Sequence, residues 1–141
     1  MIHDSLYSSR SEEWGTPQAL FDKLNAKYHF DLDVCASKEN AKCEHYFTKE
    51  QDGLAQKWWG TVWCNPPYGR EIRKWVEACV NYEGLSVMLV PARVDTKWFH
   101  DCIYNNPRCE IEFPRGRLRY NDGKVPAPFP SMIVVTKKKG A

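Results

Sequence analysis

The stretch from residue 61 to residue 90 constrains the fold more than any other part of the chain. Residues 61–63 are β-branched or aromatic and predict a short strand over 61–64, and the apolar run 85–90 predicts a buried one. Between them, residues 70–82 carry apolar side chains at the i, i+3, i+4, i+7 and i+8 positions of a helix, and Gly84 follows. A helix between two strands predicts a parallel pair within an α/β sheet. The helical stripe consists of Ile72, Trp75, Val76, Cys79 and Val80.

The same alternation extends toward the N-terminus. Thr16-Pro17 is a typical helix start, with threonine as the N-cap and proline at the first helical position. Residues 30–35 alternate as a strand, and the polar residues 37–57 predict mostly loop. The helix after Thr16 has an apolar face made of Leu20, Phe21, Leu24 and Tyr28.

The pattern changes in the last third of the chain. Asp95 or Thr96 is expected to cap one more helix, which carries Trp98 and Phe99. The following runs, residues 109–113, 118–120 and 132–136, predict strands without helices between them. We therefore expect an α/β fold whose sheet is mostly parallel and closes with an antiparallel C-terminal edge.

Composition limits the classes of protein that fit. With 141 residues, 43% of them hydrophobic and 27% charged, the chain is expected to form one domain over residues 14–137. The polar segment 1–13 is expected to be flexible, and residues 138–141 to form a basic tail. No apolar run is long enough to span a membrane and the N-terminus lacks a signal peptide, so a cytoplasmic protein is expected. The six cysteines have no Cys-x-x-Cys spacing, which favours reduced, buried thiols and no metal site.

Charge is distributed unevenly along the chain. Residues 103–141 hold eight lysines and arginines against three acidic residues, whereas residues 1–102 are acidic overall. Clustered arginines are suited to phosphate contacts. The candidate nucleic-acid-binding residues are Arg93, Arg115, Arg117 and Arg119.

The tetrapeptide Asn65-Pro66-Pro67-Tyr68 follows the strand at 61–64 and suits one kind of chemistry. A planar amino group is a poor nucleophile until its lone pair is localised, and two acceptors can achieve this by holding its two N–H groups. The Asn65 side-chain oxygen is one acceptor, and the Pro66 carbonyl is another, because a Pro-Pro backbone cannot join a helix or ladder. Tyr68 offers a flat face for stacking. The alternative is a simple turn after a strand.

Three polar clusters come directly after predicted strands, at residues 33–37, 65–68 and 91–95. Ligands of open α/β sheets bind at the carboxyl ends of strands. We therefore expect one shared site there.

Asn65–Tyr68, placed after a strand, resembles the catalytic motif of amino-directed methyltransferases that use S-adenosylmethionine. Further segments occur in the matching order, and together they resemble the small phage-type DNA adenine-N6 methyltransferases from Trp14 to Val135. The segments are residues 14–21, 30–36, 46–54, 63–69, 89–99 and 116–120.

This resemblance implies an abbreviated Rossmann-like methyltransferase sheet with helices on both faces. It places Thr16 and Pro17 at the methionine end of the cofactor and residues 33–36 beneath it. It also implies a place for Asp52 and Leu54 near the cofactor adenine. The implied cofactor-binding residues are Thr16, Pro17, Asp33, Cys35, Ala36, Asp52, Leu54 and Asn65, and the implied catalytic residues are Asn65, Pro66, Pro67 and Tyr68.

The sequence departs from the larger methyltransferases at one point. Val34–Ser37 stands in place of their glycine-rich loop, and few residues separate Asp33 from Asn65. We therefore expect the usual second strand, its helix and its ribose-binding acid to be missing, with Glu39 or Asn40 as the replacement for the acid.

The expected activity is transfer of a methyl group from S-adenosylmethionine to the N6 amino group of adenine in double-stranded DNA, at specific sites read by loops within 105–128. The target base must be flipped out of the duplex and would stack on Tyr68. The resemblance also suggests protection of a phage genome from host nucleases. Three alternatives stay open: methylation of RNA adenine, methylation of a protein glutamine, and an inactive nucleic-acid-binding module.

Overall fold

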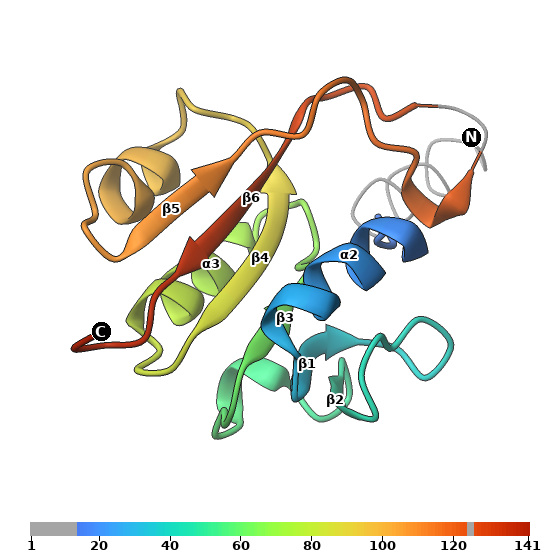
Figure 1. Cartoon of the computed structure of the whole chain (residues 1–141), viewed down its shortest axis with the longest axis horizontal. Coiled ribbons are helices and arrows are strands. Elements are labelled where there is room, and N and C mark those ends of the chain that lie inside the picture. The colour runs from blue at the N-terminus through green and yellow to red at the C-terminus, as the bar shows by residue number, and fades with distance from the viewer. Residues whose placement is uncertain (1–13, 124–125) are drawn as a thin grey trace.

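The computed structural model describes residues 14–123 and 126–141, which contain one six-stranded sheet with the strand order β2-β1-β3-β4-β6-β5 (Figure 1). The first four strands in this order are parallel, and β6 is antiparallel to both β4 and β5. The α/β class and the antiparallel C-terminal edge are therefore confirmed. The strands are β1 Leu32–Ala36, β2 His45–Thr48, β3 Val62–Cys64, β4 Ser86–Pro91, β5 Cys109–Glu112 and β6 Ser131–Thr136. The N-terminal segment 1–13, expected to be flexible, lies outside the described residues.

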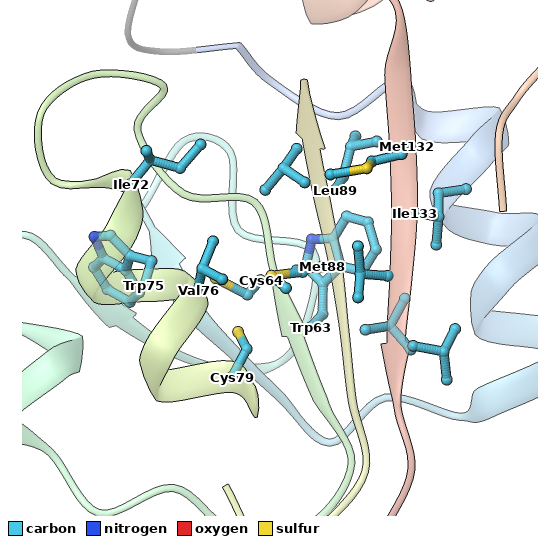
Figure 2. Close-up of a cluster of buried hydrophobic side chains, with 14 of the residues drawn as sticks. Trp63, Cys64, Ile72, Trp75, Val76, Cys79, Met88, Leu89, Met132 and Ile133 are labelled. Atoms are coloured by element: carbon cyan, nitrogen blue, oxygen red, sulfur yellow. The ribbon is translucent and has the colours of Figure 1, made fainter. Parts of the chain in front are cut away.

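Helices cover both faces of the sheet. Trp63 and Cys64 are neighbours in β3 and so point to opposite faces. The ring of Phe21, in α2, lies 5.4 Å from the Trp63 ring, whereas the Cys64 thiol contacts Cys79 of α3. Figure 2 shows Cys64 beside the α3 side chains Val76 and Cys79. The helices are α2 Gln18–Tyr28 and α3 Ile72–Asn81, with the short turns η1 Gly53–Ala55, η2 Phe99–Ile103 and η3 Tyr120–Asp122.

The apolar stripe predicted for α3 is confirmed, since all five of its side chains are buried. The C-terminal end of α3 is held by Arg108, which lies just before β5. Its guanidinium donates to the carbonyls of Val80 at 2.8 Å and Tyr82 at 2.7 Å, and also to that of Lys137. These bonds satisfy carbonyls that a helix end otherwise leaves without partners.

Two expectations about strands were wrong. A second strand, β2, lies within the stretch predicted as loop and pairs in parallel with β1, with a turn instead of a helix between them. It has four residues on a sheet edge, none of them fully buried, too few for a periodic signal. The strand predicted at 118–120 is absent. Tyr120 instead begins η3, where Asn121 and Asp122 both have positive φ.

Two further features are smaller corrections. The predicted helix after Thr96 is largely a single wide turn, η2, which is assigned as π-helix. The Thr96 hydroxyl accepts from the Phe99 N–H at 3.3 Å, as expected of a cap. All six cysteines are free, but only Cys64 and Cys79 are buried. Within the described residues, no helix is long and apolar enough to cross a bilayer.

Candidate functional site

A cavity of about 690 Å³ lies at the carboxyl ends of β1 and β3. It is the place where the three polar clusters were expected to meet, and the first two of them line it. Predicted residues in its lining are Thr16, Asp33, Cys35, Ala36, Glu39, Asn40, Asp52, Leu54, Asn65, Pro66 and Pro67. Pro17 and Tyr68 are not part of the lining, and neither is any of the four arginines.

Asn65 has one end of its amide engaged and the other unpartnered. Its Nδ2 donates to the Trp14 carbonyl and, at 3.0 Å, to the Thr16 hydroxyl. Its Oδ1 is buried and has no hydrogen-bond partner among the described residues. A buried acceptor without a donor is costly, so it marks a position where a ligand N–H is expected. The two bonds made by Nδ2 fix which way the amide faces.

The Pro66 carbonyl is a second available acceptor. Within residues 14–123 and 126–141, no backbone or side-chain donor reaches it. Asn65 and Pro66 are adjacent residues of the cavity lining, and each carries an oxygen that no described donor reaches. Such a pair can receive the two hydrogens of one amino group.

Asp33 is the buried acid of the site, with 2% of its surface exposed. Burial raises the pKa of its carboxyl to about 6, although the N–H groups of Lys42 and Cys35 donate to it and oppose the rise. The carboxylate form therefore exists at neutral pH at a cost in free energy. A cation bound in the cavity would lower that cost.

The η1 turn forms the wall that carries Asp52 and Leu54. A Cβ at Gly53 would lie 2.0 Å from the Val34 carbonyl oxygen, so only glycine lets this turn approach β1 so closely. Asp52 has a φ of 55°. The Asp52-Gly53 turn thereby places Asp52 and Leu54 against the same cavity.

The opposite wall contains two residues that sequence reasoning missed as site residues, Asn121 and Asp122. The Asn121 side chain accepts from the Gly15 N–H at 2.8 Å, and the Asn121 N–H donates to the Gly15 carbonyl at 2.7 Å. Asp122 accepts from the Gln18 N–H at 3.1 Å, and so caps α2 in the role predicted for Thr16. Figure 1 shows this orange segment against the N-terminal end of α2.

No local sequence pattern predicts the contacts of Asn121 and Asp122, because the paired residues are more than a hundred positions apart. The other unpredicted residues in the lining are Trp14, Gly15, Lys42, Thr48, Lys49, Gly53, Trp63, Glu71 and Trp75. Several of them are sequence neighbours of predicted site residues, and extending each predicted segment by one residue would have included them.

Tyr68 lies behind the cavity rather than on its surface. Its ring is 8% exposed and meets the rings of Tyr120 and Phe129 edge to face. Its hydroxyl donates to the Leu89 carbonyl at 2.8 Å and lies 3.3 Å from the Tyr120 hydroxyl. The ring predicted to stack on a base is thus packed against two other aromatic rings in this conformation.

The four candidate arginines are exposed, and none forms a salt bridge with another described residue. Arg93 follows β4, while Arg115, Arg117 and Arg119 follow β5. Since β4 and β5 both run antiparallel to β6, their carboxyl ends share the sheet edge that holds the cavity. The loop after β5 then leads directly into η3.

Comparisons with known proteins agree with this arrangement. A family model described as DNA N-6-adenine-methyltransferase (Dam) matches residues 4–138. A protein of Escherichia phage T1 named DNA N-6-adenine-methyltransferase is 36% identical over an alignment of 99 residues, with 65% of this chain and 41% of that protein covered. A protein of Haemophilus phage HP1 with the same name is 32% identical over 111 residues, 74% of this chain and 64% of that protein. The chain thus spans less than two thirds of the length of either relative.

Proposed function

The chain belongs to the DNA N-6-adenine-methyltransferase (Dam) family, and we propose that it transfers a methyl group from S-adenosylmethionine to the N6 nitrogen of adenine in double-stranded DNA. The observation that carries the proposal is the pair of unused acceptors, Asn65 Oδ1 and the Pro66 carbonyl, beside the cavity. The names of both phage relatives support the choice of adenine in DNA over RNA adenine or protein glutamine.

In the proposed mechanism, the main role of the protein is to orient the adenine amine toward the methyl donor. Asn65 Oδ1 and the Pro66 carbonyl accept the two N–H groups of the adenine amine and direct its lone pair toward the methyl donor. When bound, the cofactor supplies an electrophilic methyl group attached to a sulfonium sulfur. As the methyl group is transferred to nitrogen, the rest of the cofactor becomes a neutral thioether. The methylated nitrogen then releases one proton to solvent. Acceptors fixed before the reaction stabilise the developing charge without reorganisation.

Asp33 gives the cavity a preference for a cationic ligand. S-adenosylmethionine carries a sulfonium and an ammonium, and either charge near Asp33 would offset the cost of keeping this carboxylate ionised. Asp52 and Leu54 form a separate wall, where an acceptor and an apolar side chain suit the adenine, and Glu39 or Asn40, also in the lining, is proposed to contact the ribose. Thr16 and Pro17 are proposed to position the methionine end, Thr16 from the lining and Pro17 from the start of α2.

DNA is proposed to lie across the sheet edge that carries the exposed arginines after β4 and β5. These side chains contact phosphates, while the target adenine is flipped toward the acceptors at a cost of a few kcal/mol. Stacking of that base on Tyr68 requires part of its ring to be uncovered, because the side chain is buried and packs against Phe129 and Tyr120.

The test is methylation of duplex DNA with radiolabelled S-adenosylmethionine, followed by digestion to nucleosides. Label in N6-methyl-2′-deoxyadenosine is expected, and mapping the labelled sites tests sequence specificity. Label found instead in RNA or in protein glutamine would contradict the choice of substrate. The absence of any heat on titration with the cofactor would favour an inactive binding module.

Asn65→Ala provides the mechanistic control. Transfer is expected to fall by roughly 100- to 1000-fold, the usual effect of removing one preorganised electrostatic contact. Cofactor binding is expected to weaken too, since Asn65 holds Thr16, but by less than the transfer rate falls. An Asn65→Ala enzyme with full activity would rule out the proposed role of the amide.

A further inference from the structure

Gln18, at the start of α2, joins two charged residues that the proposed mechanism does not use. Its backbone N–H donates to Asp122 Oδ1 at 3.1 Å, and its side-chain carbonyl accepts from Lys42 Nζ at 2.7 Å. The Gln18 amide is held in this orientation because its Nε2 donates to Asp22 at 2.8 Å. An ammonium from one part of the chain and a carboxylate from another therefore lie on either side of one residue.

Both charged residues line the cavity, and they do not pair with each other. The salt bridges found in the described part of the chain include neither Lys42 nor Asp122. The Lys42 ammonium has three donors, of which Gln18 receives one. The Asp122 carboxylate has a second oxygen beyond the one that caps α2. Each group therefore retains capacity for a ligand in the cavity.

Their positions are fixed by the surrounding backbone. The Lys42 N–H donates to the buried Asp33 at 3.1 Å, which ties the residue 42 turn to the end of β1. Asn121 pairs with Gly15 through two hydrogen bonds and thereby fixes the neighbouring Asp122. The Lys42 ammonium and the Asp122 carboxylate, held in these positions, suit a ligand that has a negative group to face Lys42 and a positive group to face Asp122.

We propose that Lys42 and Asp122 bind the α-amino acid end of the methyl donor, Lys42 its carboxylate and Asp122 its ammonium. The inference rests on the proposed use of S-adenosylmethionine. An α-amino acid is a zwitterion whose two charges are two bonds apart, so it can contact both side chains at once. The apolar part of the lining, with Leu54 and Trp75, is left for the adenine.

The test compares two ligands that differ only at this end. S-adenosylhomocysteine retains the amino acid, whereas 5′-methylthioadenosine keeps the nucleoside and sulfur but lacks it. Titration calorimetry on the full chain is expected to show that Lys42→Gln and Asp122→Asn each weaken S-adenosylhomocysteine by about tenfold or more, as for a lost charged hydrogen bond. Binding of 5′-methylthioadenosine should stay within about twofold.

Asp122→Asn is chosen because asparagine is also a good helix cap, so α2 keeps an acceptor for the Gln18 N–H. Unchanged thermal melting of the ligand-free variant would establish that point. Lys49→Gln removes another cation from the same lining and should not discriminate between the two ligands. Selective weakening by Lys49→Gln would mean that general charge, and not the Lys42–Asp122 pair, governs binding.

The outcomes separate the two levels of the proposal. If the wild-type chain binds both ligands and the Lys42 and Asp122 variants weaken them equally, the amino acid assignment is wrong while the cofactor proposal stands. If the wild-type chain binds neither ligand, the proposed use of S-adenosylmethionine is refuted, and this inference with it.

Discussion

Replacing Asp33 by asparagine should stabilise the ligand-free protein more strongly as the pH rises. Burial raises the pKa of Asp33 from 3.8 to about 6. A raised pKa in an acid means that the fold favours the protonated form. The resulting stability is fully present below the unfolded pKa and is lost as the pH rises through the folded one. Asparagine does not titrate, so the variant avoids this loss.

The size of the effect follows from the two pKa values. One pKa unit corresponds to 1.36 kcal/mol, so the complete loss is about 3 kcal/mol. Between about pH 4.5 and pH 7.5, roughly 2 kcal/mol of it develops. The amide also replaces one carboxylate oxygen by an N–H donor facing a backbone N–H, but this cost is nearly independent of pH. It cancels when the same pair of proteins is compared at two pH values.

Urea unfolding of the two ligand-free proteins at about pH 4.5, 6 and 7.5 measures the effect. The free energy of unfolding of Asp33→Asn minus that of the wild type should rise by roughly 2 kcal/mol over this range. Glu50→Gln, which removes an exposed carboxylate that is not part of the cavity lining, supplies the correction for general charge. A difference that stays constant to within about 0.5 kcal/mol would refute the assignment of Asp33 as a buried acid kept ionised at a cost.

Three further predictions concern other parts of the molecule. In Gly53→Ala, the added Cβ would lie 2.0 Å from a carbonyl oxygen of β1, so η1 must move away from that strand. We expect calorimetry to show weaker cofactor binding and a lower melting temperature. Arg108→Ala should lower the free energy of unfolding by about 2–3 kcal/mol, because three carbonyls lose a charged donor; a urea titration measures the loss, and no change would contradict the role of Arg108 as a cap. Changing Arg115 or Arg117 to glutamine should reduce the slope of log affinity for DNA against log salt by about 1 each, measured by fluorescence anisotropy, and an unchanged slope would remove that residue from the DNA surface.

Elements could be predicted from the sequence where the residues that determine them are close together in the chain. The stripe on α3 and the apolar run of β4 each contain their own pattern, so both elements were located within one or two residues. The position of the polar clusters after β1 and β3 likewise follows from the rule that ligand sites gather at carboxyl strand ends. The family resemblance then supplied the chemistry proposed for this cavity, methyl transfer to an amino group.

Prediction failed where the determinants lie far apart in the chain. The wall formed by η3 depends on backbone groups of Gly15 and Gln18, so no property of residues 118–122 alone distinguishes it from a strand. The burial of Tyr68 has the same origin, because Phe129 and Tyr120 supply the rings that surround it. The short β2 was missed for a different reason, since a four-residue edge strand carries little periodic information.

The contact between η3 and Gly15 also bears on how long the enzyme would stay with one DNA molecule. The loop that carries three arginines is the same loop that closes one side of the cavity through Asn121. If DNA holds that loop in place as proposed, the spent cofactor would have one fewer way out. Replacement of the cofactor would then tend to follow release of the DNA, which predicts one methyl transfer per encounter and not a run of transfers along a duplex.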